Sequence, residues 1–254
     1  MTDPWLRCFQ RRPGALVRLV CFPHAGGNAA FYRPWVALLP PSVELVAVQY
    51  PGRLDRLDEP CIRDMPTMVQ RITAALVGQW HPALALFGHS MGASVAFEVA
   101  RRLEDAYGRE IVRLFVSGRE PPQHQRRSKV DVADDDALWM EVRRLGGTDV
   151  QAVDNAALRA AALPAVRGDY QLIDGYRTRP GRPLASPISA MVGDVDTETN
   201  ATEMAGWAAH TSADFTLRAF PGDHFYLMAQ RSAVVEEVRR GLLAVTAVER
   251  DLMP

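Results

Sequence analysis

The chain has 254 residues, of which 48% are hydrophobic and 23% charged, and this composition is typical of one globular domain with a large core, here spanning residues 1–254. Its 29 basic and 30 acidic side chains leave a formal net charge of −1, which excludes an overall field that attracts nucleic acid or an anionic membrane. Three cysteines without metal-ligand spacing, and no apolar run near the ~20 residues that span a bilayer, predict a cytoplasmic protein without metal or membrane.

Six short apolar runs predict the strands of one sheet. Runs that are apolar on both faces are typical of buried parallel strands. In chain order they are "RLVCFP" (18–23), "ELVAVQYP" (44–51), "ALALFGHS" (83–90), "IVRLFVSG" (111–118), "PISAMVG" (187–193) and "FTLRAFPG" (215–222). Segments with helical spacing alternate with them, at 29–39, 65–80, 91–108 and 232–250. This alternation predicts an α/β protein with a mostly parallel sheet flanked by helices.

The connection between the strands that end near Gly118 and begin at Pro187 is much longer than the dozen or so residues that a crossover needs. Within it, "DDDALWMEVRRLGG" (134–147) and "NAALRAAALPAVRGDYQLIDGY" (155–176) have helical spacing. We interpret residues 133–176 as a helical lid inserted into the domain, because long insertions in compact domains usually serve binding. The alternative is an ordinary layer of helices with long loops.

The segment "LALFGHSMGASVAFEVARRL" contains the pattern G-x-S-x-G at the junction of a predicted strand and a predicted helix. In that setting the pattern forms a sharp turn, and glycines at Gly88 and Gly92 avoid collisions with neighbouring backbone. The turn presents the Ser90 hydroxyl at the carboxyl edge of the sheet, where α/β folds bind ligands. Ser90 is therefore predicted to be a nucleophile. The alternative is a serine that only caps the following helix.

A serine nucleophile needs a base that takes its proton and an acid that orients that base. On this type of fold the acid follows a later strand and the histidine follows the last strand. Of the histidines after Ser90, His224 comes directly after the last predicted strand, whereas His210 lies in a helical run. Two acids, Asp194 and Asp196, follow the strand that ends at 193. We predict His224 as the base and prefer Asp196 as the acid, with Asp194 as the alternative.

Acyl transfer builds negative charge on the carbonyl oxygen, so the site also needs N–H donors that form an oxyanion hole. One donor is expected from the backbone of Met91, the residue after the nucleophile. The second is expected from the glycine-rich loop "CFPHAGGNAAF" after the first predicted strand, with Ala25 as the candidate. This chemistry requires no metal and no cofactor.

Five segments together resemble the stand-alone type II thioesterases of polyketide and nonribosomal peptide synthesis. They are "FPHAGGNAAFYRPW", "VQYPGR", "FGHSMGASVAFEVARRL", "SGREPP" and "GDHFYL", within a match from roughly residue 19 to residue 243. Members of that family are α/β hydrolases with a helical lid, and they cleave acyl groups from the phosphopantetheine arm of carrier proteins. The resemblance implies a catalytic triad and an oxyanion hole made of Ser90, Asp196, His224, Ala25 and Met91. It also implies an acyl or peptidyl carrier protein as partner and no cofactor.

Other functions are compatible with a chain that has these features. A chain-terminating thioesterase fused to its synthase and an ordinary carboxylesterase use the same triad. A hydrolase fold that only binds a ligand is a further alternative, because fold does not fix function.

Two further groups of residues are predicted from their place in the chain. Apolar residues of the insertion are expected to line an acyl channel, unless they only pack the insertion itself; they are Trp139, Met140, Leu145 and Leu172. The loop "REPPQHQRRSK" (119–129) follows a strand whose end shares the edge of Ser90, and it is rich in cations. We expect its Arg126, Arg127 and Lys129 to help dock an acidic carrier protein, unless it is simply a solvated basic loop.

Overall fold

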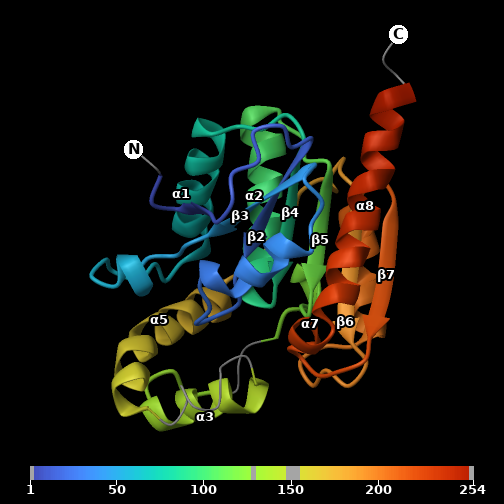
Figure 1. The fold of residues 1–254 in the computed structure, drawn as a ribbon. Helices are drawn as coiled ribbons and strands as arrows, with labels where there is room; N and C mark the ends of the chain where they lie inside the picture. The colour runs from blue at the N-terminus through green and yellow to red at the C-terminus, as the bar shows by residue number, and fades with distance from the viewer. Residues whose placement is uncertain (1–2, 127–129, 147–154, 252–254) are drawn as a thin grey trace.

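The fold is built on one sheet of seven strands, six of them parallel (Figure 1). The computed structural model describes residues 3–126, 130–146 and 155–251. The strands lie in the order β1-β3-β2-β4-β5-β6-β7, and only β1 runs antiparallel to its neighbour. Their bounds are β1 Leu6–Cys8, β2 Val17–Phe22, β3 Val43–Val48, β4 Leu84–His89, β5 Arg113–Ser117, β6 Ile188–Gly193 and β7 Phe215–Phe220. The predicted α/β architecture with a mostly parallel sheet is confirmed.

The first strand, β1, was not predicted from the sequence. It has three residues, Leu6–Cys8, which are too few to show an alternating pattern. It extends the sheet by pairing antiparallel with β3, with Leu6 opposite Val48. The other six strands lie within one residue of the predicted starts, or two in the case of β5.

Helices cover both faces of the sheet (Figure 1). The described helices are η1 Ala29–Ala37, η2 Leu54–Arg56, α1 Met65–Gly78, α2 Met91–Tyr107, η3 Pro122–His124, α3 Asp135–Leu145, α5 Ala156–Gly175, α6 Ala201–Met204, η4 Ala205–His210, α7 Tyr226–Ala229 and α8 Arg231–Asp251. One core contains the buried faces of α1 and α2, and the other contains those of η1 and α8. None of the described helices combines the length and apolar character needed to cross a membrane.

The segment predicted as a helix at 29–39 forms the 3-10 helix η1. Pro34 lies inside it and has no N–H to donate, which works against continuous α-helical hydrogen bonding. Asn28 caps its start, because the side chain accepts a hydrogen bond of 2.9 Å from the Ala30 N–H. Tyr32 and Trp35 then fill the core on this face of the sheet.

The long connection from β5 to β6 contains α3 and α5, which lie beyond the carboxyl ends of the strands (Figure 1). Capping side chains define their starts: Asp134 for α3 and Asn155 for α5. The two helices share a small hydrophobic cluster that includes Trp139 and Val166. The later part of α5 joins the main core instead, through residues such as Leu172. The insertion is thus packed on itself at one end and on the domain at the other.

The turn from β4 into α2 fits only because two of its residues have no side chain. A Cβ atom at Gly88 would lie 2.2 Å from the Gly92 carbonyl oxygen. At Gly92 it would lie 2.1 Å from the Phe22 carbonyl oxygen of β2. Backbone atoms of a packed sheet cannot move aside as the end of a flexible side chain can. The close approach of α2 to the sheet therefore depends on both glycines.

We expect Gly92→Ala to lower the free energy of unfolding by about 1–3 kcal/mol, the usual cost of forcing extra atoms into a packed interior. Gly78→Ala is the matched control, because Gly78 ends α1 and a Cβ there would meet nothing within 4 Å. Urea-induced unfolding followed by circular dichroism measures both. Equal stability of the two variants would show that the turn tolerates a side chain at Gly92.

Candidate active site

Ser90 lies on the turn between β4 and α2, with backbone angles φ 54° and ψ −123°. A residue with a side chain rarely adopts a positive φ, and such strain costs on the order of 1–3 kcal/mol. The turn is held by the Ser90 N–H, which donates a hydrogen bond of 2.8 Å to the Ser117 carbonyl at the end of β5. This places a partly exposed serine at the carboxyl edge of the sheet, as the sequence pattern predicts.

The structure brings His224 and Asp196 together at the same edge. The His224 Nδ1 lies 2.9 Å and 3.2 Å from the two carboxylate oxygens of Asp196. An ionised carboxylate only accepts hydrogen bonds, so Nδ1 carries the hydrogen and Nε2 is left as the basic nitrogen. The Asp196 side chain is 0% exposed and that of His224 3%, so water does not compete for this contact.

The two alternatives from the sequence lie elsewhere. Asp194 is exposed, and its carboxylate accepts a hydrogen bond of 2.9 Å from the Gly222 N–H. His210 lies in η4 beside Phe97 and Trp207 and contacts the Gln123 side chain. The geometry therefore favours Asp196 and His224 as partners of Ser90.

Ser90 and His224 line the same cavity. Among the described residues, no hydrogen bond joins the Ser90 hydroxyl to His224. Such contacts are often long before substrate binds and tighten in the complex. The cavity wall thus presents a serine hydroxyl and an oriented imidazole to one shared space.

Two backbone N–H groups without an acceptor among the described residues belong to residues that line this cavity. In the loop after β2, the Gly26 N–H donates to Asp169 at 2.8 Å and the Gly27 N–H donates to the His24 carbonyl at 2.9 Å. Neither Ala25 nor Met91 donates its N–H to any described residue, and both line the cavity with Ser90. Met91 is the first residue of α2, where N–H groups have no partner within the helix. These two N–H groups are the pair expected from the sequence.

A buried ion pair next to this loop was not predicted. Arg53, in the loop after β3, makes a bidentate contact with Asp169 on α5, at 2.7 and 2.9 Å. Burial alone would lower the pKa of Arg53, but the adjacent Asp169 carboxylate raises it overall. The sequence contains Arg53 within the "VQYPGR" segment, yet nothing in the helical pattern around Asp169 indicates a partner 116 residues away.

Two further imidazoles, those of His24 and His89, are buried beside His224. Burial lowers the pKa of His24 to about 3, and burial also lowers the pKa of His89 well below its usual value. His89 Nδ1 lies 3.0 Å from the Ser117 hydroxyl, which in turn lies 2.7 Å from the Tyr226 hydroxyl. Both rings are therefore neutral near pH 7, and His224 is the histidine of this cluster with a carboxylate partner for a positive charge.

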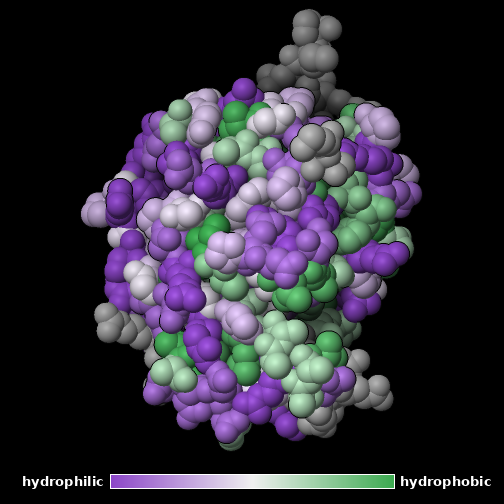
Figure 2. Space-filling view, turned by 90° about the vertical axis from the view of Figure 1, so that its left-hand side faces the viewer, coloured by the Kyte–Doolittle hydropathy of each residue, from purple (hydrophilic) through white to green (hydrophobic). Residues whose placement is uncertain are grey.

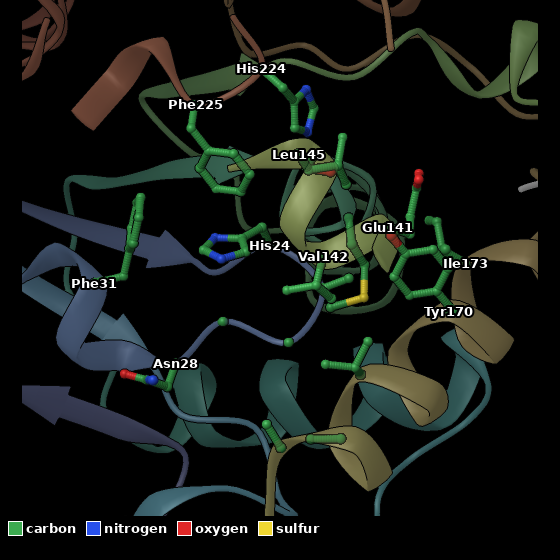
Figure 3. Close-up of a pocket in the computed structure, with 18 of the residues that line it drawn as sticks. His24, Asn28, Phe31, Glu141, Val142, Leu145, Tyr170, Ile173, His224 and Phe225 are labelled. Carbon is green, nitrogen blue, oxygen red and sulfur yellow. The ribbon is translucent and has the colours of Figure 1, made fainter. Parts of the chain in front are cut away.

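The cavity has a volume of about 980 Å³ and an apolar wall formed by α3 and α5. Figure 3 shows the rings of His24, Phe31 and Phe225 on one side of it and Tyr170 and Ile173 on the other. Of the four residues expected along an acyl channel, Trp139 and Leu145 line the cavity.

The other two do not, and this corrects the prediction. Met140 is 69% exposed because it points away from the helix face that carries Trp139. Leu172 is fully buried in the main core and does not line the cavity. Hydrophobic character alone did not distinguish the inner face of α3 from its outer face.

The cavity mouth combines exposed leucines with paired charges. Leu54, Leu57 and Leu158 line it and are at least half exposed. Figure 2 shows a face on which hydrophilic surface is interrupted by several hydrophobic patches. Arg126 also lines the cavity, and it forms an ion pair of 3.0 Å with Glu203. The two other predicted docking residues, Arg127 and Lys129, lie outside the described residues.

A protein metal site needs several His, Cys, Asp or Glu side chains grouped at ligand distance from one point. In residues 3–126, 130–146 and 155–251, no cluster of three or more His, Cys, Asp or Glu side chains has a suitable arrangement. Cys8, Cys21 and Cys61 are free thiols. Burial raises the pKa of all three, so none of them is an activated nucleophile.

Comparison with known proteins places this arrangement in a family. A family model described as a thioesterase domain matches residues 17–242, which include Ser90, Asp196 and His224. The thioesterase PikA5 of Streptomyces venezuelae is 43% identical over 240 residues, which cover 94% of this chain and 85% of PikA5.

Solved structures give the same result. The type II thioesterase BorB from the borrelidin biosynthetic cluster superposes with a TM-score of 0.89 at 41% identity, covering 95% of this chain and 99% of BorB. The RedJ thioesterase from the prodiginine pathway in Streptomyces coelicolor gives a TM-score of 0.85 at 34% identity, covering 91% of this chain and 87% of RedJ. The chain therefore has the α/β-hydrolase fold and belongs to the thioesterase family.

Proposed function

We propose that this thioesterase hydrolyses acyl groups from the phosphopantetheine arm of an acyl or peptidyl carrier protein in polyketide or nonribosomal peptide synthesis. The observation that carries the proposal is the cavity that Ser90 shares with His224, whose other side is fixed by the buried Asp196. PikA5, BorB and RedJ, to which the chain is similar, are thioesterases; BorB is a type II enzyme from the borrelidin cluster, and RedJ comes from the prodiginine pathway. We also place the reaction in the cytoplasm, as expected from the sequence.

In the first half of the reaction, His224 Nε2 accepts the Ser90 proton while the serine oxygen attacks the thioester carbonyl. The negative charge that develops on the carbonyl oxygen is stabilised by the N–H groups of Ala25 and Met91. The tetrahedral intermediate collapses when the carbon–sulfur bond breaks, and His224 returns the proton to the leaving pantetheine thiol. Asp196 keeps the imidazole oriented and stabilises its positive charge.

In the second half, a water molecule replaces the thiol. His224 accepts a proton from this water as its oxygen attacks the acyl-serine carbonyl, and the same N–H groups hold the second oxyanion. The intermediate collapses with release of the free acid, and His224 returns the proton to Ser90. Every proton thus passes through one imidazole, and the cycle ends with the enzyme in its starting state.

We propose that α3 and α5 act as the lid of this cavity and that their apolar wall holds the acyl chain. The proposal is supported by the small separate cluster that joins the two helices and by the cavity residues that they contribute. We retain Arg126, Arg127 and Lys129 as a proposed docking site for the carrier. The ion pair of Arg126 with Glu203 lowers the free positive charge that Arg126 offers.

Two alternative reactions use the same residues. A carboxylesterase cleaves oxygen esters with the same triad, and a chain-terminating thioesterase releases a finished product. The family match favours a thioesterase over a carboxylesterase. The first experiment therefore compares substrates.

Turnover on an acyl-carrier thioester should exceed turnover on the matching acyl p-nitrophenyl ester, and Ser90→Ala should abolish both. Rates are measured by release of carrier thiol and of p-nitrophenol. Ser94→Ala is the control, because Ser94 is buried on α2 and does not line the cavity. Preference for the oxygen ester would favour the carboxylesterase, and full activity in Ser90→Ala would remove Ser90 as nucleophile.

We expect Asp196→Asn to lower kcat by about four orders of magnitude, the effect of removing the orienting carboxylate in a serine protease. Asp194→Asn should change kcat little, since Asp194 contacts the Gly222 N–H rather than His224. Steady-state hydrolysis of one acyl-carrier substrate measures both variants. A larger loss in Asp194→Asn would reverse the assignment.

Substitution of a cavity residue should change the preference for acyl length. Leu145→Ala widens the apolar wall, so its ratio of kcat/KM for long over short acyl groups should differ from that of the unmodified chain. Met140→Ala, on the exposed side of the same helix, should leave the ratio unchanged. A panel of acyl groups on one carrier protein gives the ratios. A uniform loss across all lengths in Leu145→Ala would show that Leu145 only packs the helix.

A further inference from the structure

The buried ion pair between Arg53 and Asp169 has no part in the mechanism described above. Asp169 is 0% exposed, and the Arg53 side chain is 7% exposed. The contact is bidentate, with Arg53 Nη1 and Nη2 at 2.7 and 2.9 Å from the two carboxylate oxygens. It joins the loop after β3 to helix α5, two segments far apart in the sequence.

The same two side chains also hold the backbone of the loop after β2. Asp169 Oδ2 accepts a hydrogen bond of 2.8 Å from the Gly26 N–H. Arg53 Nη1 donates one of 2.9 Å to the Gly27 carbonyl. In the two residues directly after Ala25, the negative carboxylate thus holds an N–H group and the positive guanidinium holds a carbonyl group.

The conformation of this loop leaves little freedom at Gly26. Its φ of 75° favours glycine, and a Cβ atom there would lie 2.8 Å from Val166 Cγ2 on α5. The peptide group between Ala25 and Gly26 is therefore fixed on its nitrogen side by Asp169 and packed closely against α5. Rotation of this peptide group would be coupled through the shared Cα to the adjoining peptide, which carries the Ala25 N–H.

We propose that Asp169 and Arg53 are positioning residues that keep the Ala25 N–H directed into the oxyanion hole. This inference rests on the proposed function, in which Ala25 stabilises the oxyanion. Asp169 belongs to α5, so the oxyanion hole is complete only when this helix is seated on the loop. The ion pair is electrically balanced and adds no net charge beside the developing oxyanion.

Stability alone is a weak explanation for such a pair. The cost of removing two charges from water often exceeds their attraction, and apolar residues of similar volume replace buried ion pairs with little loss of stability. A role in positioning explains instead why both charges contact the same short loop.

The test measures kcat and KM separately on an acyl-carrier thioester. Removal of one oxyanion donor lowers kcat by about 10²–10³-fold, and a displaced donor should lose part of that, so we expect Asp169→Asn to lower kcat by about 10–100-fold. KM should change little, because the donor acts in the transition state. Arg167→Ala is the matched control on α5. This substitution removes contacts with Asp135 and the Val132 carbonyl. Arg167 contacts neither the loop after β2 nor the cavity.

A second variant separates the loss of loop positioning from simple unfolding of the protein. The double substitution Arg53→Met with Asp169→Leu keeps apolar volume at both sites and should retain the cooperative thermal unfolding of the protein. It lacks the acceptor for the Gly26 N–H, so it should show the same loss of kcat. Unchanged kcat in both variants, relative to Arg167→Ala, would overturn the proposal.

Binding of a trifluoromethyl ketone analogue of acyl-pantetheine gives an independent readout, because its adduct with serine carries an oxyanion. In Asp169→Asn its inhibition constant should rise by about the same factor as kcat/KM falls, while a non-reactive thioether analogue should bind as before. Equal weakening of both analogues would indicate a merely structural role and overturn the proposal. If the unmodified protein forms the ketone adduct but hydrolyses no carrier thioester, the proposed function fails, and the ketone comparison still decides the inference.

Discussion

The whole site depends on the turn at Ser90, where α2 starts so close to the sheet that no side chain fits at Gly88 or Gly92. This contact sets the positive φ of Ser90 and leaves the first N–H group of α2, that of Met91, at the cavity with no acceptor in the described part of the chain. Packing of the domain supplies the energy that holds the strained serine. The positions of the proposed nucleophile and of one proposed oxyanion donor thus follow from one steric constraint.

The parallel sheet then brings the other residues of the site to the same edge as Ser90. β2, β4, β6 and β7 all run in one direction, so the segments that follow them share one edge. This is why Ala25, Ser90, Asp196 and His224, spread over most of the chain, meet around one cavity or directly behind it. The helices α3 and α5 cover this edge, and α5 contributes a carboxylate to the loop that carries Ala25.

Much of this arrangement could be predicted from the sequence, because its signals are local. Strand ends, the G-x-S-x-G pattern and the position of His224 after the last strand pointed to the residues that the structure brings together. The three-residue β1 was missed because it is too short for a pattern. The outward position of Met140, the core position of Leu172 and the pairing of Arg53 with Asp169 were missed because each depends on how distant segments pack. The catalytic roles of Ser90, Asp196 and His224 remain predictions.

The central claim is that Ser90 is the residue that carries the acyl group. The most direct measurement is reaction with a fluorophosphonate probe, followed by mass mapping of the modified peptide. We predict a single modification at Ser90 and loss of labelling in His224→Ala, because the serine hydroxyl then lacks its base. Labelling at another serine such as Ser117, or unchanged labelling without His224, would contradict the account.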